Sequence, residues 1–534
     1  MKRIKKQREA LGIEGLKKKE EILDKAMKKN EEAAPEQIMS SVMIPDGSSI
    51  KFHAVTSYRT TDSHQLEHFD LKKMPVTFQF DQISSNFVYL SAVIDTSVIP
   101  LELKPYIPLF LEMALESPVL EGETEIPYEE VVAKLSEDTV EHSFSLGVGG
   151  HRFMPGAFSQ SAVLSIQAEP AKYETAVGWM RKLLFQTRLT AERARVLGTK
   201  MESSVSEMKR DGNEVVEIMM NSMMFQAESN HQATNMIRQQ EFLKKLRARL
   251  DCSPNEVLSN LEEIRFLLTS PSNMMVHMAG DLDSLGQDPL AAWGKFLPPH
   301  VPKKVSPAVV TAEHQLALPP PSHLLAGLGS CESSFLSRTA PGLTDPRSPS
   351  LAPLLLAIQY LTQLEGPMWR QIRGAGLAYG YSIVVSTNKG QIYFTLFKAT
   401  NPVKAYEEGK RLVMSQVNGE EPWDPLQVEA AKYSLIFQLI EREKTVGEVV
   451  QESLLSSMKG VDREFNRKFL EMVKNVSLEE LKRVGTEYLG PLFSETTRTA
   501  IVCNPSKVEE IKNDFQALGV EFKVLESVDQ LHQL

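Results

Sequence analysis

Residues 369–381 read WRQIRGAGLAYGY, a glycine-bearing turn that separates Arg373 from Tyr379 at the start of an alternating segment. The alternation of apolar and polar residues over Ala378–Val385 predicts a strand, and a second such segment follows at Gln391–Lys398. Two neighbouring strands joined by a short connection are expected to pair antiparallel.

The elements around this stretch occur twice along the chain. The first copy has the expected order of a strand at Asn86–Asp95, a helix at Leu101–Ser117, strands at His142–Gly150 and Ser161–Ala168, a helix opened by Pro170 and a long helical tract from Thr190 to about Phe225. The second copy has a helix at Ala352–Leu364, the two strands above and a helix opened by Pro402.

Two landmarks keep nearly the same offset between the copies. Pro170 and Pro402 lie 232 residues apart, and the expected capping boxes that begin at Ser253 and Ser477 lie 224 residues apart. We therefore expect an α+β protein with two homologous domains, each a mainly antiparallel sheet with helices packed on one face.

Composition suggests where the segments begin and end. We expect a charged connector helix at 1–33, a linker with short strands at 34–79, a first domain at 80–296, a Pro-rich linker at 297–325 and a second domain at 326–534.

The composition also excludes several classes of function. A net charge of −10 over 534 residues gives no overall basic field, so we expect no nucleic-acid partner. The longest apolar stretches, such as Leu351–Leu361, reach about half of the roughly 20 residues that a membrane span needs, so we expect no membrane insertion. Three scattered cysteines favour a reducing compartment. We expect a cytoplasmic protein, with a mitochondrial location as part of a longer precursor as the alternative.

The residues Arg373 and Tyr379 suggest a shared chemistry. A guanidinium and a phenol at a sheet edge can both donate hydrogen bonds to a peptide carbonyl, and both bonds strengthen where negative charge develops on that oxygen. The alternative is an ordinary strand start with a surface ion pair.

The segment Ile372–Tyr379 resembles the Arg and Tyr signature in the C-terminal half of pitrilysin-type zinc metallopeptidases, a family that includes insulysin. The spacing is closest to the presequence protease branch, and the resemblance covers roughly residues 80–534. It implies that Arg373 and Tyr379 hold the backbone of a peptide substrate and stabilise the oxyanion, while a zinc-bearing N-terminal half supplies the metal. The charged segment 1–33 resembles the connector between the halves of longer relatives.

The helix that would bind zinc in a catalytic domain of this family carries His-x-x-Glu-His. The corresponding residues 109–113 read LFLEM, so Leu109 and Met113 stand where two histidines would be needed. We therefore expect a non-catalytic domain, with Glu112 facing solvent or paired, and no zinc bound by this chain.

A second segment, His64-Gln-Leu-Glu67-His68, does match His-x-x-Glu-His. On a helix His64 and His68 would share a face, and Glu67 could orient a water molecule. The candidates for a third ligand are Glu129, Glu130, Glu137 and Glu141. The segment lies only a few residues before Pro75 and lacks a long apolar helix around it, so we do not expect a metal site there.

Three functions are open from the sequence. The leading one is a non-catalytic half that holds peptide for a zinc-bearing partner, and the first alternative is a proteolytically inactive scaffold or complex subunit. The second alternative is a self-sufficient zinc protease that uses His64, Glu67 and His68. The glycine-rich residues 147–150 are expected to form a turn, since no helix start follows that could bind phosphate.

Overall fold

The computed structural model describes residues 2–32, 35, 37, 50–63, 66, 69–299, 301, 322–495 and 497–533. Its contacts divide the chain into two units, residues 1–52 and residues 53–534. No helix among the described residues is both long enough and apolar enough to cross a membrane.

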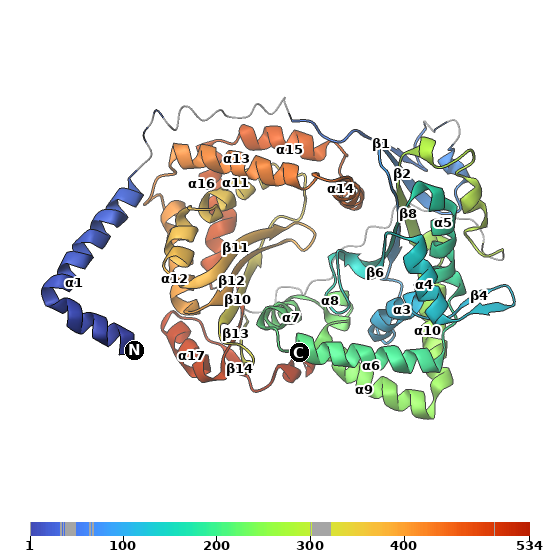
Figure 1. Ribbon diagram of the computed structural model, residues 1–534, viewed down its shortest axis with the longest axis horizontal. Coiled ribbons are helices and arrows are strands. Elements are labelled where there is room, and N and C mark those ends of the chain that lie inside the picture. Colours follow the sequence, from blue (N-terminus) through green and yellow to red (C-terminus); the bar gives the residue numbers. More distant parts are fainter. Residues whose placement is uncertain are drawn as a thin grey trace. The chain divides into compact units, whose positions relative to one another are not determined.

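The first unit contains the helix α1 (Lys2–Glu31), drawn in dark blue in Figure 1. Gly12 interrupts it with a φ of 57°, a left-handed conformation that glycine adopts at little cost. The helix lies within the segment expected to be helical, and its role as a connector stays a prediction.

The second unit contains two six-stranded sheets, each built from one half of the sequence (Figure 1). The strands of the first sheet, in spatial order, are β1 (Val55–Arg59), β2 (Thr77–Ile83), β8 (Met274–Gly280), β3 (Val88–Asp95), β7 (Ala157–Ala168) and β6 (Glu141–Val148). Among these described strands, only β2 and β8 pair in parallel. Strand β1 and the start of β2 fall inside the segment expected to be a linker, where the structure pairs them with each other.

The second sheet repeats this order. Its strands are β14 (Lys523–Leu525), β9 (His323–Gly327), β13 (Arg498–Cys503), β10 (Ser334–Pro341), β12 (Gln391–Ala399) and β11 (Ala378–Ser386). From β9 to β11 the strands match β2 to β6 in order and in direction, whereas β14 is parallel to β9 and β1 is antiparallel to β2. The expected α+β class with mainly antiparallel sheets is confirmed, and descent of both halves from one duplicated domain stays a prediction.

The helices of each half follow its strands in the chain. The first half has α3 (Ile107–Leu115), α4 (Tyr128–Asp138), α5 (Tyr173–Arg181), α6 (Ala191–Met208), α7 (Gly212–Met224), α8 (Asn230–Ala233), α9 (Met236–Cys252) and α10 (Pro254–Leu268), and a small hairpin of β4 (Val119–Glu121) and β5 (Thr124–Ile126). The second half has α11 (Leu351–Thr362), α12 (Pro402–Val417), α13 (Pro425–Glu441), α14 (Val446–Met458), α15 (Phe465–Lys474), α16 (Leu478–Val484) and α17 (Val508–Ala517).

Two expected helix features differ in the structure. The tract from Thr190 is two helices, because Asp211 accepts a hydrogen bond from the Asn213 amide and so caps a new helix, α7. The capping box at Ser477 is present, but Ser253 makes no side-chain cap bond. Ser253 also closes α9, and its N–H is already bonded to the Arg249 carbonyl, so the reciprocal bond of a box cannot form.

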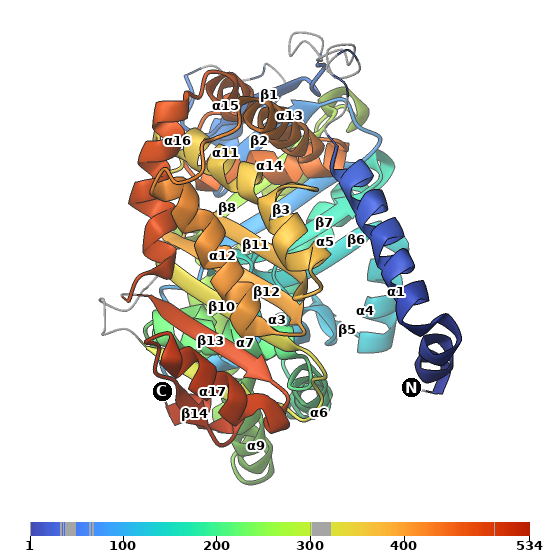
Figure 2. The same cartoon turned by 90° about the vertical axis from the view of Figure 1, so that its left-hand side faces the viewer.

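The two halves exchange helices across their sheets (Figures 1 and 2). One face of each sheet carries helices of its own half, including α3 and α5 on the first sheet and α11 and α12 on the second. On the opposite face of the first sheet, α14 packs Val449 and Leu454 into small apolar clusters with strand residues. On the opposite face of the second sheet, α7 contacts β10 and β13. Each half therefore covers a sheet of the other half.

Candidate functional site

The structure brings Arg373 and Tyr379 together. Arg373 lies on the helical turn η9 (Trp369–Gly374), and its guanidinium carbon is 4.6 Å from the centroid of the Tyr379 ring. Tyr379 begins the exposed part of β11 with 62% of its surface accessible, and Arg373 is exposed as well. Both donors therefore reach solvent beside the same sheet edge.

Backbone contacts fix the turn between these two residues. Ile372 is fully buried beneath it, and its carbonyl accepts a hydrogen bond from the Leu377 amide at 2.9 Å. Gly376 has a φ of 72°, and its carbonyl accepts a hydrogen bond from the Thr400 hydroxyl at 2.6 Å. The glycine of the sequence motif is thus needed for the backbone conformation that places Arg373 over the ring.

A third residue, Tyr381, belongs to the same cluster and was missed by sequence reasoning. It lies two residues after Tyr379 on β11, which puts both side chains on one face of the strand. Its hydroxyl donates to the Thr362 carbonyl at 3.4 Å. Burial raises the pKa of Tyr381 to about 12, while the charge of Arg373 acts in the opposite direction. The period of two along the strand was the signal that could have found it.

Strand β11 has a free edge. It lies at the end of the second sheet, where β12 is its partner among the described strands. Within the described part of the chain, no other backbone group is hydrogen-bonded to residues 378–386. An edge of this kind offers N–H and C=O groups to another extended chain.

The helix equivalent to a zinc helix is α3, and its residues do not fit a metal. Leu109 and Met113 are fully buried in the core and supply no imidazole nitrogen. Glu112 is paired, because Arg152 donates from Nε to Oε1 at 2.5 Å and from Nη2 to Oε2 at 2.9 Å. Arg152 also donates to the Ser204 hydroxyl at 2.7 Å, so the carboxylate joins α3 to α6.

Other candidate metal ligands give no site in the described part of the chain. Across those residues, no group of three or more His, Cys, Asp or Glu side chains is arranged to hold a metal ion. His64, Glu67 and His68 lie outside the described residues, so the His-x-x-Glu-His segment is not placed. The glycine-rich residues 147–150 form the expected turn, where a Cβ on Gly150 would lie 2.0 Å from the Leu146 carbonyl oxygen.

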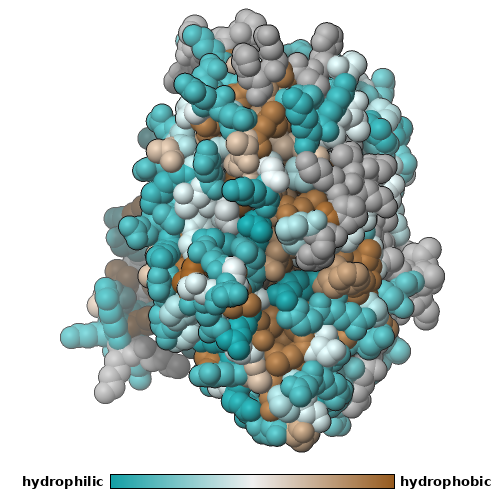
Figure 3. All heavy atoms as spheres, turned by 90° about the vertical axis from the view of Figure 1, so that its right-hand side faces the viewer, coloured by the Kyte–Doolittle hydropathy of each residue, from teal (hydrophilic) through white to brown (hydrophobic). Residues whose placement is uncertain are grey.

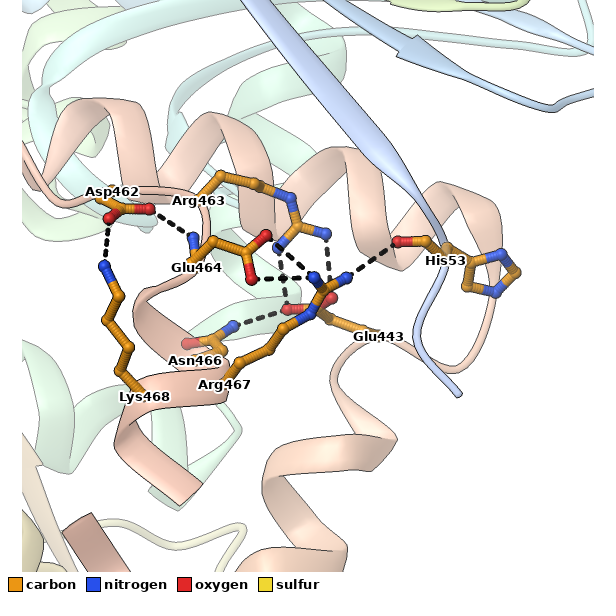
Figure 4. Close-up of polar contacts among 8 residues, drawn as sticks. All are labelled: His53, Glu443, Asp462, Arg463, Glu464, Asn466, Arg467 and Lys468. Carbon is orange, nitrogen blue, oxygen red and sulfur yellow. Dashed lines mark hydrogen bonds and ion pairs between the residues drawn. The ribbon is translucent and has the colours of Figure 1, made fainter. Parts of the chain in front are cut away.

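A cluster of charged residues joins α13, α15 and the segment before β1 (Figure 4). Arg463 forms two hydrogen bonds to the Glu443 carboxylate, and Asn466 donates a third at 2.7 Å. Burial raises the pKa of Glu443, but these bonds outweigh it, so the net pKa is lowered. Arg467 donates to the His53 carbonyl at 3.3 Å. Because these groups are paired with one another, the cluster is an anchor rather than a reactive site.

Hydrophobic side chains form patches on the side of the molecule where α5 and α10 lie in Figure 1 (Figure 3). Phe266 on α10 is 78% exposed and lines a groove of about 920 Å³ together with Val98 and Phe185. Exposed patches of this kind are typical of contact surfaces.

Comparisons of sequence support a peptidase relationship. Residues 9–246 match the model of the family described as peptidase M16, subfamily C, associated. Over 556 residues the chain is 29% identical to an uncharacterised protein of Schizosaccharomyces pombe, covering 99% of this chain and 53% of the relative. An uncharacterised protein of Caenorhabditis elegans is 27% identical over 523 residues, covering 96% of this chain and 52% of the relative. The chain spans about half the length of these curated relatives.

Solved structures show the same fold. A peptidase M16 inactive domain from Pseudomonas fluorescens is similar with a TM-score of 0.60 and 13% identity, over 80% of this chain and 96% of that domain. The periplasmic protease PqqL of Escherichia coli has a TM-score of 0.58 and 12% identity, over 93% of this chain and 55% of PqqL.

The fold and the paired donors beside β11 define the class of the chain as a non-catalytic half of a two-half peptidase fold. With the family match over residues 9–246, the chain corresponds to the C-terminal half of a pitrilysin-type peptidase. The resemblance that the Arg373 and Tyr379 spacing implies is thus confirmed. The presequence protease branch within the family stays a prediction.

Proposed function

We propose that this chain holds peptide substrate for a zinc-bearing N-terminal half and does not itself carry the metal. Arg373 and Tyr379 donate hydrogen bonds to a backbone carbonyl of the substrate and stabilise the oxyanion that forms during hydrolysis. The observation that carries the proposal is the stacking of the exposed Arg373 guanidinium on the Tyr379 ring at the start of a free sheet edge.

The stacking has a direct chemical consequence. A guanidinium that lies over an aromatic face keeps its N–H groups free around its rim, where they can donate in the plane of the group. The ring restricts the arginine before substrate arrives, so less conformational entropy is lost on binding. Arg373 stays charged at any pH at which proteins fold, so its donor strength does not depend on a proton equilibrium.

The test is turnover of a quenched peptide by the chain combined with its zinc-bearing half. Arg373→Ala is expected to lower kcat/KM by about 100-fold, the usual loss of one oxyanion donor, with an unchanged far-ultraviolet spectrum. Arg373→Lys keeps the charge but not the planar fork and should recover only part of the activity. Arg370→Ala, an exposed neighbour on the same turn, is the matched control. Equal turnover of Arg373→Ala and the control would contradict the proposal.

A proteolytically inactive scaffold is the second candidate, and the likeness to a domain described as inactive favours it. A scaffold would bind its partner without holding a substrate carbonyl. It therefore predicts that Arg373→Ala changes neither peptide turnover nor assembly, which is the result that separates the two functions.

Zinc content tests the remaining alternative. Because Leu109 and Met113 cannot bind zinc, our account expects the purified chain to lack stoichiometric metal by elemental analysis. One zinc per chain that is lost in His64→Ala, together with chelator-sensitive cleavage by the chain alone, would favour a self-sufficient protease.

A further inference from the structure

A groove of about 320 Å³ lies between α7 and the second sheet. The helix contributes Val216, Met220 and Asn221, and the sheet contributes Ser337, Tyr393 and Phe397. Its walls therefore come from both halves of the chain. This volume falls within the range of pockets that take small ligands or single side chains, and such pockets are common where domains meet.

Two buried polar side chains open into the groove. Asn221 is 5% exposed and Ser337 is 7% exposed, and neither side chain is hydrogen-bonded to another described residue. An asparagine amide has two donors and an acceptor, and burying such groups without partners costs free energy. A ligand with amide groups, such as a peptide, would satisfy both residues.

The charges at the groove oppose each other. Glu217 comes from α7, and Lys389 comes from the turn between β11 and β12. Their charges cancel in sum, while the walls between them are largely apolar. The groove therefore favours an uncharged, apolar side chain over an ionised one.

Strand β11 connects this groove with the Arg373 and Tyr379 pair. Val384 lines the groove and is 50% exposed, and it lies five residues after Tyr379 on the same strand, a distance of about 17 Å. The two residues point to opposite faces of the sheet because side chains alternate along a strand. An extended peptide along the free edge would likewise present alternate side chains to the groove.

We propose that β11 binds an extended peptide segment as an additional strand, and that the groove takes one apolar side chain of that segment. This side chain lies about five residues from the carbonyl that Arg373 and Tyr379 hold. The inference rests on the proposed function, because both sites bind the same peptide, and it adds a preference for substrates with an apolar residue at that distance.

The experiment measures fluorescence anisotropy of two labelled ten-residue peptides with the full chain. The peptides are identical except for leucine or lysine at the groove position. Wild-type chain is expected to bind the leucine peptide about tenfold more tightly. Val384→Trp fills the mouth of the groove and should remove this preference. Val196→Trp on α6 is the matched control, since Val196 is 49% exposed and lies on another element.

The outcomes separate this inference from the proposed function. Arg373→Ala should weaken binding of both peptides equally and keep the preference for leucine. If Val384→Trp keeps the preference while Arg373→Ala weakens binding, the groove inference is overturned and the proposed function stands. If Val384→Trp removes the preference while Arg373→Ala binds normally, the groove binds peptide and the clamp does not. Equal binding of both peptides by wild-type chain also overturns the inference. N-methylation of alternate peptide nitrogens should weaken binding, and unchanged affinity would exclude strand addition.

Discussion

Asp81 and His277 form a buried pair on neighbouring strands β2 and β8. Both side chains are 1% exposed, and His277 Nε2 lies 2.7 Å from Asp81 Oδ2. Ser453 of α14 donates to the same oxygen, and Gln79 donates to Oδ1 at 3.1 Å. Because Ser453 comes from the second half of the chain, these bonds tie α14 to the first sheet.

The pKa of Asp81 makes this pair testable by pH. Burial raises its pKa, but the charge of His277 and the bonds from His277 and Ser453 lower it from the ordinary 3.8 to about 2. The folded state thus favours the ionised carboxylate. Its contribution is complete above about pH 4 and is lost as the pH falls towards 2, by about 2 kcal/mol in total. Urea unfolding from pH 2 to 5 should show a shallower pH dependence for Asp81→Asn than for wild type, and parallel curves would contradict the assignment.

At this scale the sequence predicted part of the site. The spacing of Arg373 and Tyr379 around glycines predicted a turn at a strand start, because glycine and alternation act locally. The partner of Glu112 could not be found, since Arg152 is 40 residues away and reaches it only after β6 and β7 pair. Asp81 and His277 are 196 residues apart and were missed for the same reason.

Helix α7 approaches the second sheet closely at its first residue. A Cβ on Gly212 would lie 2.5 Å from the Phe335 ring and 2.7 Å from Cys331 Sγ. The close approach of a helix N-terminus to a strand therefore requires glycine. The sequence predicted helical structure here from its periodicity, but periodicity shows only that a face is buried and not which sheet buries it.

The same substitution at two helical glycines tests this packing. Gly212→Ala should lower the free energy of unfolding by about 1 to 3 kcal/mol, because the added methyl forces α7 away from Phe335. Gly178→Ala on α5, where a Cβ meets no atom within 4 Å, should instead raise it by about 0.5 to 1 kcal/mol. Urea denaturation gives both values. A neutral Gly212→Ala would show that α7 is not held against β10.

The exchange of α7 and α14 has a consequence for the whole molecule. Removing either half would expose the sheet face that the other half covers, so neither sheet is expected to be stable alone. The offsets between prolines and capping boxes predicted a repeat, and the matching strand order in both sheets supports it. The mutual covering could not be predicted, because it depends on contacts between distant segments.

Calorimetry tests this coupling. The full chain is expected to unfold residues 53–534 in one transition, with a calorimetric enthalpy equal to the van't Hoff enthalpy. Ser453→Ala should move that transition to lower temperature without splitting it. Two separable transitions, one for each sheet, would show that the halves are independent.

Binding of a non-cleavable peptide to the purified chain tests the central claim most directly. Titration calorimetry of wild type, Arg373→Ala and Arg370→Ala measures whether the pair of donors beside β11 holds a peptide without the zinc-bearing half. The account predicts that wild type and Arg370→Ala bind alike and that Arg373→Ala binds at least about tenfold more weakly, as expected for a lost charged hydrogen bond. Equal affinity of wild type and Arg373→Ala would contradict the account.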